Sequence, residues 1–283
     1  MNSAQSFTHL HVLRDGDVAH VVVDRPGVHN ALSDVTIGEL TDVFARLGAD
    51  DGVRFVVLRG EGKHFSAGAD LEYMRGIAQQ GFEANVAGAY ALADMLSAIR
   101  DCPKPVVARV QGACMGGGVG LVAACDIAVA SVDARFALSE ATLGIVPAVI
   151  SPFVLPRIGV AAARELFLTA EVFDAERARA IGLISRIVER EALDDAVAER
   201  IAALRVAGPE AQATVKRLIG AVWDDPAGAR EFTAHVIAER RASAEGQEGM
   251  SAFLERRKPA WTVADAAVDA AGDAAGGAAG DAS

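Results

Sequence analysis

Short β-branched runs alternate with helical stretches over the first half of this chain, and this alternation limits the available folds more than any other feature. Between His9 and about Leu138, the strand candidates are His11–Asp15, Val18–Asp24, Val53–Gly60, Pro105–Val110 and Cys125–Ala130. The helix candidates between them include Asp34–Leu47 and Glu83–Arg100. Strands that alternate with helices predict βαβ units and an α/β fold whose sheet is covered on its faces. A chain of 283 residues, 52% of them hydrophobic, is long enough to bury such a core.

The second half of the chain follows a different pattern. From Ala161 onward we predict an almost wholly helical region. Asp174 precedes one helical run as an N-cap, and Gly182 stands where that run is expected to end. Residues 263–283 are mostly Ala, Gly and Asp, with almost nothing large to bury, and predict a mobile tail.

Composition excludes several classes of function. The net charge of −11 argues against a nucleic acid partner, because phosphate binding needs clustered Lys and Arg. No apolar run reaches the roughly 20 residues that a membrane span requires, and the N-terminus does not resemble an export signal. The three cysteines have no metal-ligand spacing, so we expect no metal site and reduced thiols in a cytoplasmic protein.

A run of three glycines, 116–118, follows the strand candidate Pro105–Val110 and opens a helix. Gly118, Gly120 and Ala123 satisfy the G-x-G-x-x-A pattern of a dinucleotide site, but that pattern needs its first glycine at the very end of the strand. Here residues 111–115 intervene. A second interpretation is that the glycines only permit close packing of a helix on a sheet.

A third interpretation comes from a second turn of the same kind. The segment His64–Met74 follows the strand candidate Val53–Gly60, contains small residues and then begins a helix. Helix N-termini carry unpaired backbone N–H donors and partial positive charge. Two such turns can direct donors at one oxygen and form an oxyanion hole.

Five motifs, in order and at matching separations, resemble the crotonase superfamily of enoyl-CoA hydratases and isomerases. They are FSAGADL (Phe65–Leu71), QGACMGGGVGL with the following CDIAVA (Gln111–Ala130), RFALSEATLGIVP (Arg135–Pro147), AERARAIGLISRIV (Ala175–Val188) and GMSAFLERRKPAW (Gly249–Trp261). The resemblance implies a ββα spiral core (ClpP-like) in residues 1–200 and a C-terminal helical trimerisation region in residues 201–262. It also implies a homotrimer or a dimer of trimers. The substrate would be an acyl-CoA thioester, so that coenzyme A arrives with the substrate and no cofactor is tightly bound.

The resemblance also assigns residues to roles. The backbone N–H groups of Ala69 and Gly117 match the two donors to the thioester oxygen, and Glu140 matches a catalytic acid/base. Positions expected near coenzyme A are Arg25, Val28, Ala67, Asp70, Leu71, Phe253 and Arg256, the last two reaching toward the nucleotide of a neighbouring subunit. Positions expected near the acyl group are Gly116, Gly120 and Ser139.

Glu140 has apolar neighbours in sequence, which predicts a partly dry site and a raised pKa suited to proton transfer. The local sequence alone favours an exposed glutamate in a short helix, and only the family resemblance reverses this preference. Hydratases of this family commonly carry a second glutamate, and Gly120 stands at its position. One glutamate can hold and deprotonate water in a hydratase, or it can move a proton between the α and γ carbons in an isomerase. Some isomerases of the family keep only this later glutamate, so the glycine at position 120 favours isomerisation.

The segment around Glu140 favours a hydratase, because it resembles a subgroup that hydrates branched, carboxylated enoyl-CoAs such as methylglutaconyl-CoA in leucine breakdown. Arg157 could then pair with a substrate carboxylate. His29 and His64 are candidate contacts of coenzyme A, and Ser66 is a candidate for holding water. A non-catalytic acyl-CoA-binding protein and a Rossmann-type oxidoreductase are the alternatives from other classes.

Overall fold

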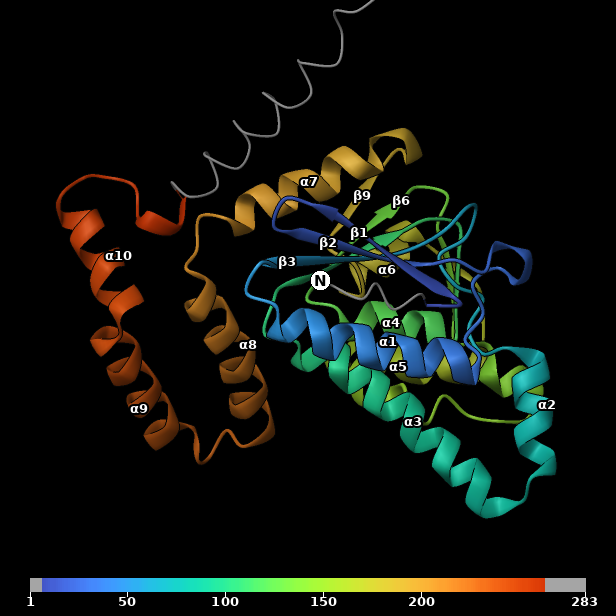
Figure 1. Ribbon diagram of the computed structural model, residues 1–283. Coiled ribbons are helices and arrows are strands. Elements are labelled where there is room, and N and C mark those ends of the chain that lie inside the picture. The colour runs from blue at the N-terminus through green and yellow to red at the C-terminus, as the bar shows by residue number, and fades with distance from the viewer. Residues whose placement is uncertain (1–6, 263–283) are drawn as a thin grey trace, which may run out of the picture. The chain divides into compact units, whose positions relative to one another are not determined.

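The computed structural model describes residues 7–262, whose helices and strands are shown in Figure 1. The strands are β1 Leu10–Asp15, β2 Val18–Val23, β3 Phe55–Gly60, β4 Val106–Val110, β5 Ala113–Met115, β6 Ile127–Ser131, β7 Arg135–Ala137, β8 Phe173–Asp174 and β9 Arg186–Val188. The helices are α1 Asp34–Ala49, α2 Leu71–Gln79, α3 Phe82–Asp101, α4 Gly117–Ala124, α5 Ser151–Thr169, α6 Ala175–Ala180, α7 Leu193–Leu204, α8 Pro209–Asp224, α9 Ala229–Ala242 and α10 Ala244–Leu254. Short 3₁₀ turns span Pro26–Val28, Ser139–Leu143 and Arg190–Ala192.

The main sheet has six strands in the order β1-β2-β3-β4-β6-β9. Only the β1–β2 pair is antiparallel, and the other four pairings are parallel. A smaller sheet has the order β5-β7-β8. Parallel strands need crossover connections, and the helices between them supply these and cover the sheet.

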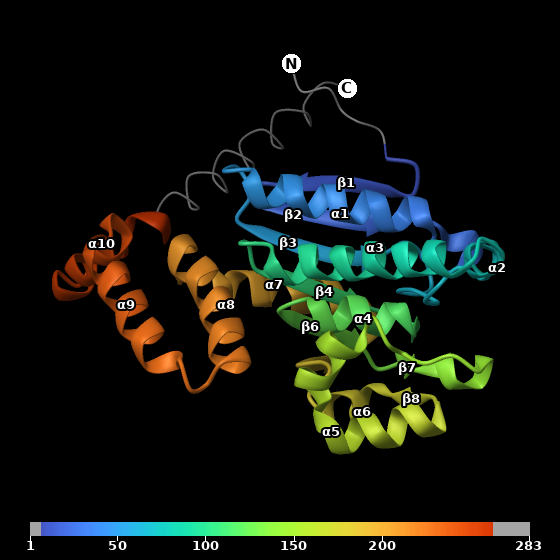
Figure 2. The ribbon, with the colours of Figure 1, turned by 90° about the horizontal axis from the view of Figure 1, so that it is seen from below.

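Helices α1 and α3 run side by side along one face of the main sheet (Figure 2), and the first turns of α7 lie on the other (Figure 1). The start of α1 is fixed by Ser33, whose hydroxyl accepts a hydrogen bond from the Thr36 N–H at 3.3 Å. Ile37, Leu40 and Phe44 then recur at helical spacing and are buried against the sheet. The periodic apolar pattern is thus what attaches the helix to the core.

The strands and helices predicted for the first half are confirmed, with ends that differ by one or two residues. The N-cap prediction is also confirmed: the Asp174 carboxylate accepts from the Arg177 N–H at 2.8 Å. Gly182 follows α6 with φ of +84°, as a helix-ending glycine does.

The prediction of an almost wholly helical region from Ala161 onward is wrong at two places. β8 pairs with β7, and β9 extends the main sheet beside β6. Likewise, the segment between β4 and the glycine run contains β5. These strands have only two or three residues, too few to show an alternating pattern, and their backbone pairing exists only in the folded chain.

The chain divides into two compact units between Arg200 and Ile201, within α7. The first unit contains both sheets, and the second contains α8, α9 and α10. In the part of the chain that is described, none of the helices is both long and apolar enough to cross a membrane. The predicted tail at residues 263–283 lies outside the described residues.

Candidate active site

The two turns with small residues lie next to each other. The Ser66 N–H donates to the Ala113 carbonyl at 3.1 Å, and the Met115 N–H donates to the Ser66 carbonyl at 2.9 Å. Ser66 and Cys114 thereby form a parallel β-bridge. The loop after β3 therefore runs alongside β5 and reaches the start of α4 together with it.

A second bridge, between Leu32 and Ala69, holds the end of this loop. The Leu32 N–H donates to the Gly68 carbonyl at 2.8 Å, and the Asp70 N–H donates to the Leu32 carbonyl at 2.9 Å. Ala69 lies between these two bonded residues, and its own N–H has no acceptor among residues 7–262. An exposed donor fixed on both sides is what an oxyanion hole requires.

The second donor lies close to the first. Gly117 is the first residue of α4, so its N–H has no partner within the helix. A Cβ built on Gly117 would lie 3.9 Å from the Ala69 nitrogen. Gly68 makes this approach possible, because its φ is +86° and a Cβ there would lie only 2.6 Å from the Met115 carbonyl oxygen. The predicted pair of donors, Ala69 and Gly117, is thus brought together at one place.

Glu140 lies beside this pair. A Cβ on Gly116 would be 3.1 Å from Glu140 Oε1, so the carboxyl group packs against the residue just before Gly117. Gly116 has φ of +47°, which together with this contact requires glycine there. Glu140 Oε2 is buried and has no hydrogen-bond partner in the described part of the chain. Burial raises the pKa of Glu140, as expected for a carboxyl group that transfers protons near neutral pH.

Gly120 lies one helical turn beyond the donor Gly117, and the space beside it is filled. A Cβ at Gly120 would be 2.6 Å from Cγ2 of Ile150 and 3.6 Å from Cδ1 of Leu96. Both side chains belong to the core. Where the resemblance leads one to expect a second glutamate, this chain has a dry apolar contact.

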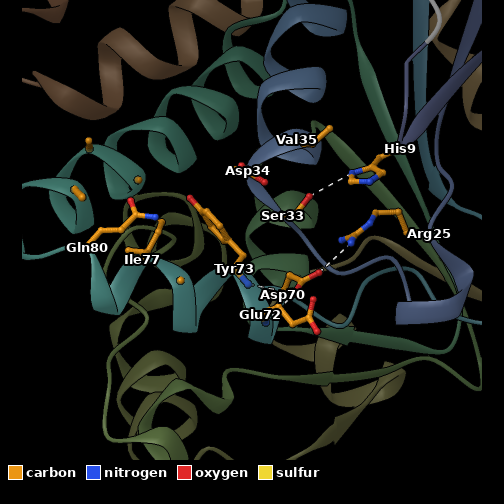
Figure 3. A pocket seen from close by; sticks show the side chains of 14 residues that line it. His9, Arg25, Ser33, Asp34, Val35, Asp70, Glu72, Tyr73, Ile77 and Gln80 are labelled. Carbon is orange, nitrogen blue, oxygen red and sulfur yellow. Dashed lines mark hydrogen bonds and ion pairs between the residues drawn. The ribbon is translucent and has the colours of Figure 1, made fainter.

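A pocket of about 610 Å³ lies on the α2 side of the loop that carries Ala69 (Figure 3). Arg25 and Asp70 line it, and Figure 3 shows the guanidinium of Arg25 pointing at the Asp70 carboxylate. Their Nη2–Oδ2 distance is 3.0 Å. His9, Ser33 and Tyr73 line the same pocket.

The other residues assigned to coenzyme A are distributed more widely. Ala67 is half-buried and its N–H donates to the His29 carbonyl at 2.9 Å, while Val28 and Leu71 are exposed. Phe253 and Arg256 belong to the second unit. Ser139 is half-buried at the start of the turn that carries Glu140.

Ser66 does not fit the role of holding water. Its buried hydroxyl donates to the Asn30 carbonyl at 2.9 Å and accepts from the Gly68 N–H at 3.2 Å. The side chain therefore braces the loop. His64 has a similar position, because its Nδ1 accepts from the Ala113 N–H at 3.0 Å. Burial, with the adjacent His29, lowers the pKa of His64, which favours the neutral ring.

Arg157 lies away from the donors. Its Nε donates to the Ala123 carbonyl at 3.2 Å, next to the last residue of α4. Gly117 is the first residue of that helix, about 9 Å away along its axis. A role for Arg157 at a substrate carboxylate therefore has no support from this geometry.

Sequence reasoning missed two residues that shape the site. Asn30 is fully buried with φ of +57°, and its amide nitrogen donates to the carbonyls of Glu61 and His64 at 2.9 and 2.8 Å. Its Oδ1 accepts from the Arg25 N–H. An asparagine three residues after an Arg-Pro-Gly sequence is a signal for such a turn. The contact of Ile150 with Gly120 could not be predicted, because nothing in the sequence distinguishes this isoleucine from other core residues.

Comparison with known proteins supports this description. The family model for enoyl-CoA hydratase/isomerase matches residues 14–264. A crystal structure of an enoyl-CoA hydratase from Shewanella pealeana superposes with a TM-score of 0.87 at 41% identity, covering 91% of this chain and 97% of the other.

Two relatives differ in their named activities. The Citrobacter koseri carnitinyl-CoA dehydratase is 35% identical over 263 residues, which is 89% of this chain and 97% of the relative. A peroxisomal Δ(3,5)-Δ(2,4)-dienoyl-CoA isomerase from Arabidopsis thaliana is 36% identical over 207 residues, 68% of this chain and 74% of the relative.

Proposed function

This chain belongs to the enoyl-CoA hydratase/isomerase family, within the crotonase superfamily, and on that premise we propose that it adds water across the 2,3 double bond of an enoyl-CoA thioester. The fold is the α/β crotonase fold with C-terminal helices. The catalytic role of Glu140 rests on its position beside the two backbone donors, and the choice of hydration over isomerisation rests on the resemblance of the segment around Glu140.

In the proposed reaction, the thioester oxygen accepts hydrogen bonds from the N–H groups of Ala69 and Gly117. The Glu140 carboxylate takes a proton from a water molecule, and the hydroxide adds to C3. The C2–C3 π electrons shift to form the enolate, whose negative oxygen the two donors stabilise. Protonated Glu140 then returns a proton to C2, so that one water is added and the carboxylate is regenerated.

One observation carries this assignment: the Glu140 carboxyl group is adjacent to the donor pair, and its buried Oε2 has no partner within residues 7–262. A structural glutamate would satisfy that oxygen. The filled space at Gly120 leaves Glu140 to act without a second carboxylate at that position.

The same observation favours isomerisation as a second candidate. A single glutamate can take a proton from C2 of a 3-enoyl-CoA and return it to C4 of the enolate, moving the double bond without water. The apolar contact at Gly120 is compatible with this reaction, because no second group is needed to hold a water molecule.

Incubation in D₂O with a 2-enoyl-CoA and a 3-enoyl-CoA, followed by mass spectrometry, separates these activities. Hydratase activity predicts addition of one water to the 2-enoyl substrate and its loss in Glu140→Gln. Double-bond migration without water addition would show an isomerase instead. If neither substrate reacts but both bind, the protein is an acyl-CoA-binding member of the family.

The acyl group and the assembly are finer proposals. The resemblance of the segment around Glu140 supports a branched substrate such as methylglutaconyl-CoA, and comparison of its kcat/KM with that of a straight-chain enoyl-CoA tests this. A homotrimer or dimer of trimers is supported by exposed apolar side chains on α8, α9 and α10, among them Trp223, Ile237 and Phe253.

A further inference from the structure

Arg25 uses its guanidinium to join two segments of the first unit. Nη1 donates to the Ala31 carbonyl, and Nη2 donates to the Asp70 carboxylate at 3.0 Å. The Arg25 side chain is only 15% exposed, so both groups are largely removed from water. The Arg25 backbone is itself held, because its N–H donates to Asn30 Oδ1 at 2.9 Å. The side chain has little freedom to bind elsewhere.

Asp70 is the other end of this link, and its side chain is 12% exposed. It is the N-cap of α2, where Oδ1 accepts from the N–H groups of Glu72 and Tyr73 at 2.9 and 3.4 Å. Oδ2 is left for Arg25. Burial acts to raise the pKa of Asp70, but the hydrogen bonds from Arg25 and from the two N–H groups outweigh it and lower the pKa. The carboxylate is thus charged whenever the enzyme is folded at neutral pH.

Ala69 directly precedes Asp70 in the loop and is held on both sides. On its N-terminal side, Gly68 is bonded to Leu32, and on its C-terminal side the Asp70 backbone is bonded to Leu32 and the Asp70 side chain to Arg25. Helix α2, which begins at Leu71, is mostly exposed and packs on α3 along only one side. The ion pair therefore attaches the loop to the Arg25 segment at this end.

We propose that the Arg25–Asp70 ion pair is a positioning device that holds the Ala69 N–H in line with the Gly117 N–H. The proposal rests on the proposed function, since it assumes that these N–H groups bind the thioester oxygen. Arg25 then acts through Asp70 and the loop, and does not itself contact coenzyme A. A charge-assisted pair with little exposure suits this role, because it fixes geometry more tightly than a neutral hydrogen bond.

The Asp70→Asn variant tests the ion pair without removing the helix cap. Asparagine keeps an oxygen that can accept from the N–H groups of Glu72 and Tyr73, but it removes the charge that Arg25 binds. Loss of one oxyanion donor costs about 10²–10³ in kcat, so a displaced donor is expected to cost about tenfold or more while KM changes by less than about twofold. Arg25→Gln is expected to give the same loss, and the double variant no further loss.

Binding of a substrate analogue supplies a readout that does not depend on turnover. Butanoyl-CoA labelled with ¹³C at the thioester carbonyl has no double bond to hydrate. In the wild type, its C=O stretching frequency should fall on binding, because two donors polarise the carbonyl. In Asp70→Asn and Arg25→Gln the shift should be smaller, with the analogue still bound.

Asp194→Asn is the control for loss of a different aspartate–arginine pair in the first unit. Asp194 pairs with Arg109, whose side chain is also 15% exposed, through Nε–Oδ1 and Nη2–Oδ2 contacts of 2.5 and 3.1 Å. This pair joins β4 to α7, two elements that carry neither donor. The variant should keep the wild-type kcat and carbonyl shift. Comparable losses in this control would mean that any broken ion pair has the same effect, and would overturn the proposal.

The remaining outcomes separate the proposal from the proposed function. If bound butanoyl-CoA shows no carbonyl shift in the wild type, the donor pair and with it the function are wrong. A wild-type shift that Asp70→Asn leaves unchanged would overturn only the role of the ion pair.

A raised KM with unchanged kcat in Arg25→Gln would show instead that Arg25 contacts coenzyme A. Should Asp70→Asn fail to fold, Arg25→Gln decides: an unchanged kcat and shift refute positioning, and a reduced kcat and shift with unchanged KM support it.

Discussion

Glu140 combines two properties that rarely serve stability. One of its carboxylate oxygens is buried without a partner in the described residues, and the group is packed against a glycine with positive φ. Such an arrangement costs free energy of folding, and proteins retain it where the group reacts. The residue is thus expected to weaken the fold that carries it.

Glu140→Gln should abolish turnover and stabilise the protein at neutral pH. The pKa of Glu140 is raised in the folded state by burial, so the folded protein binds more protons than the unfolded chain between the two pKa values. Stability contributed by this group is therefore present at low pH and lost as the pH rises through that window. The neutral variant avoids the loss and should gain on the order of 1 kcal/mol at pH 7. Thermal unfolding at pH 4 and pH 7 measures this, and an equal gain at both values would contradict it.

The contact between Gly120 and Ile150 makes a separate prediction. Gly120→Ala places a Cβ within 2.6 Å of Ile150 Cγ2 and should cost about 1–3 kcal/mol. Ile150→Ala alone should cost about 2–5 kcal/mol, because it leaves a cavity. The double variant should lose less than the sum of these costs, since Ile150→Ala makes room for the new methyl group and that group fills part of the cavity.

Denaturant unfolding of the four proteins gives the coupling free energy, and strict additivity would refute the contact. Gly38→Ala is the control. It also adds a methyl group within a helix, but nothing lies within 4 Å of the new Cβ. That variant should be as stable as the wild type or more stable by about 0.5–1 kcal/mol.

At the scale of whole elements, the helices and longer strands follow from the periodicity of the sequence. Capping could be predicted as well, and Asp174 shows why: an N-cap residue acts on its immediate neighbours. The short strands β5, β7, β8 and β9 could not be predicted, because their pairing depends on segments that are distant in the sequence.

The residues of the candidate site could likewise be predicted only in part. Motifs that resemble a known family identify Ala69, Gly117 and Glu140. Asn30 and Ile150 have no such motif, and their importance depends on which backbone groups and side chains they touch. A role for Ser66 in holding water is not supported, because its hydroxyl is already bonded to the Asn30 carbonyl and the Gly68 N–H.

Asp174→Ala tests the cap of α6. The change removes the acceptor for the Arg177 N–H and should cost about 1 kcal/mol of stability, with kcat unchanged. Asp174→Ser should restore most of the loss, because serine is also a good N-cap. Chemical denaturation measures both variants. Equal stability of the alanine variant and the wild type would show that the cap contributes nothing.

At the scale of the whole molecule, the second unit has an apolar surface without cover. Val215, Ile219 and Trp223 recur every four residues along α8 and are 48%, 65% and 66% exposed. A spacing of four places them on one face of the helix. An exposed stripe of this kind marks a surface that binds another protein, which agrees with the proposed assembly of identical chains.

Sedimentation should therefore give a mass of three or six times the 29.3 kDa of one chain. Ile219→Asp puts a charge into the stripe and should shift the protein toward monomers at micromolar concentration. Arg217→Ala changes an exposed residue on a different face of the same helix and should leave the mass unchanged. A wild-type protein that sediments as a monomer would refute the assembly.

The two donors of the site are main-chain groups, and this has a consequence for how the protein tolerates mutation. No substitution at Ala69, other than proline, deletes its N–H, so many side chains should be accepted there. Gly68 supplies no atom to the chemistry, yet any Cβ at Gly68 collides with the Met115 carbonyl. In a library of all single substitutions, the intolerant positions would therefore lie around the oxyanion hole and not at the residues that supply its two donors.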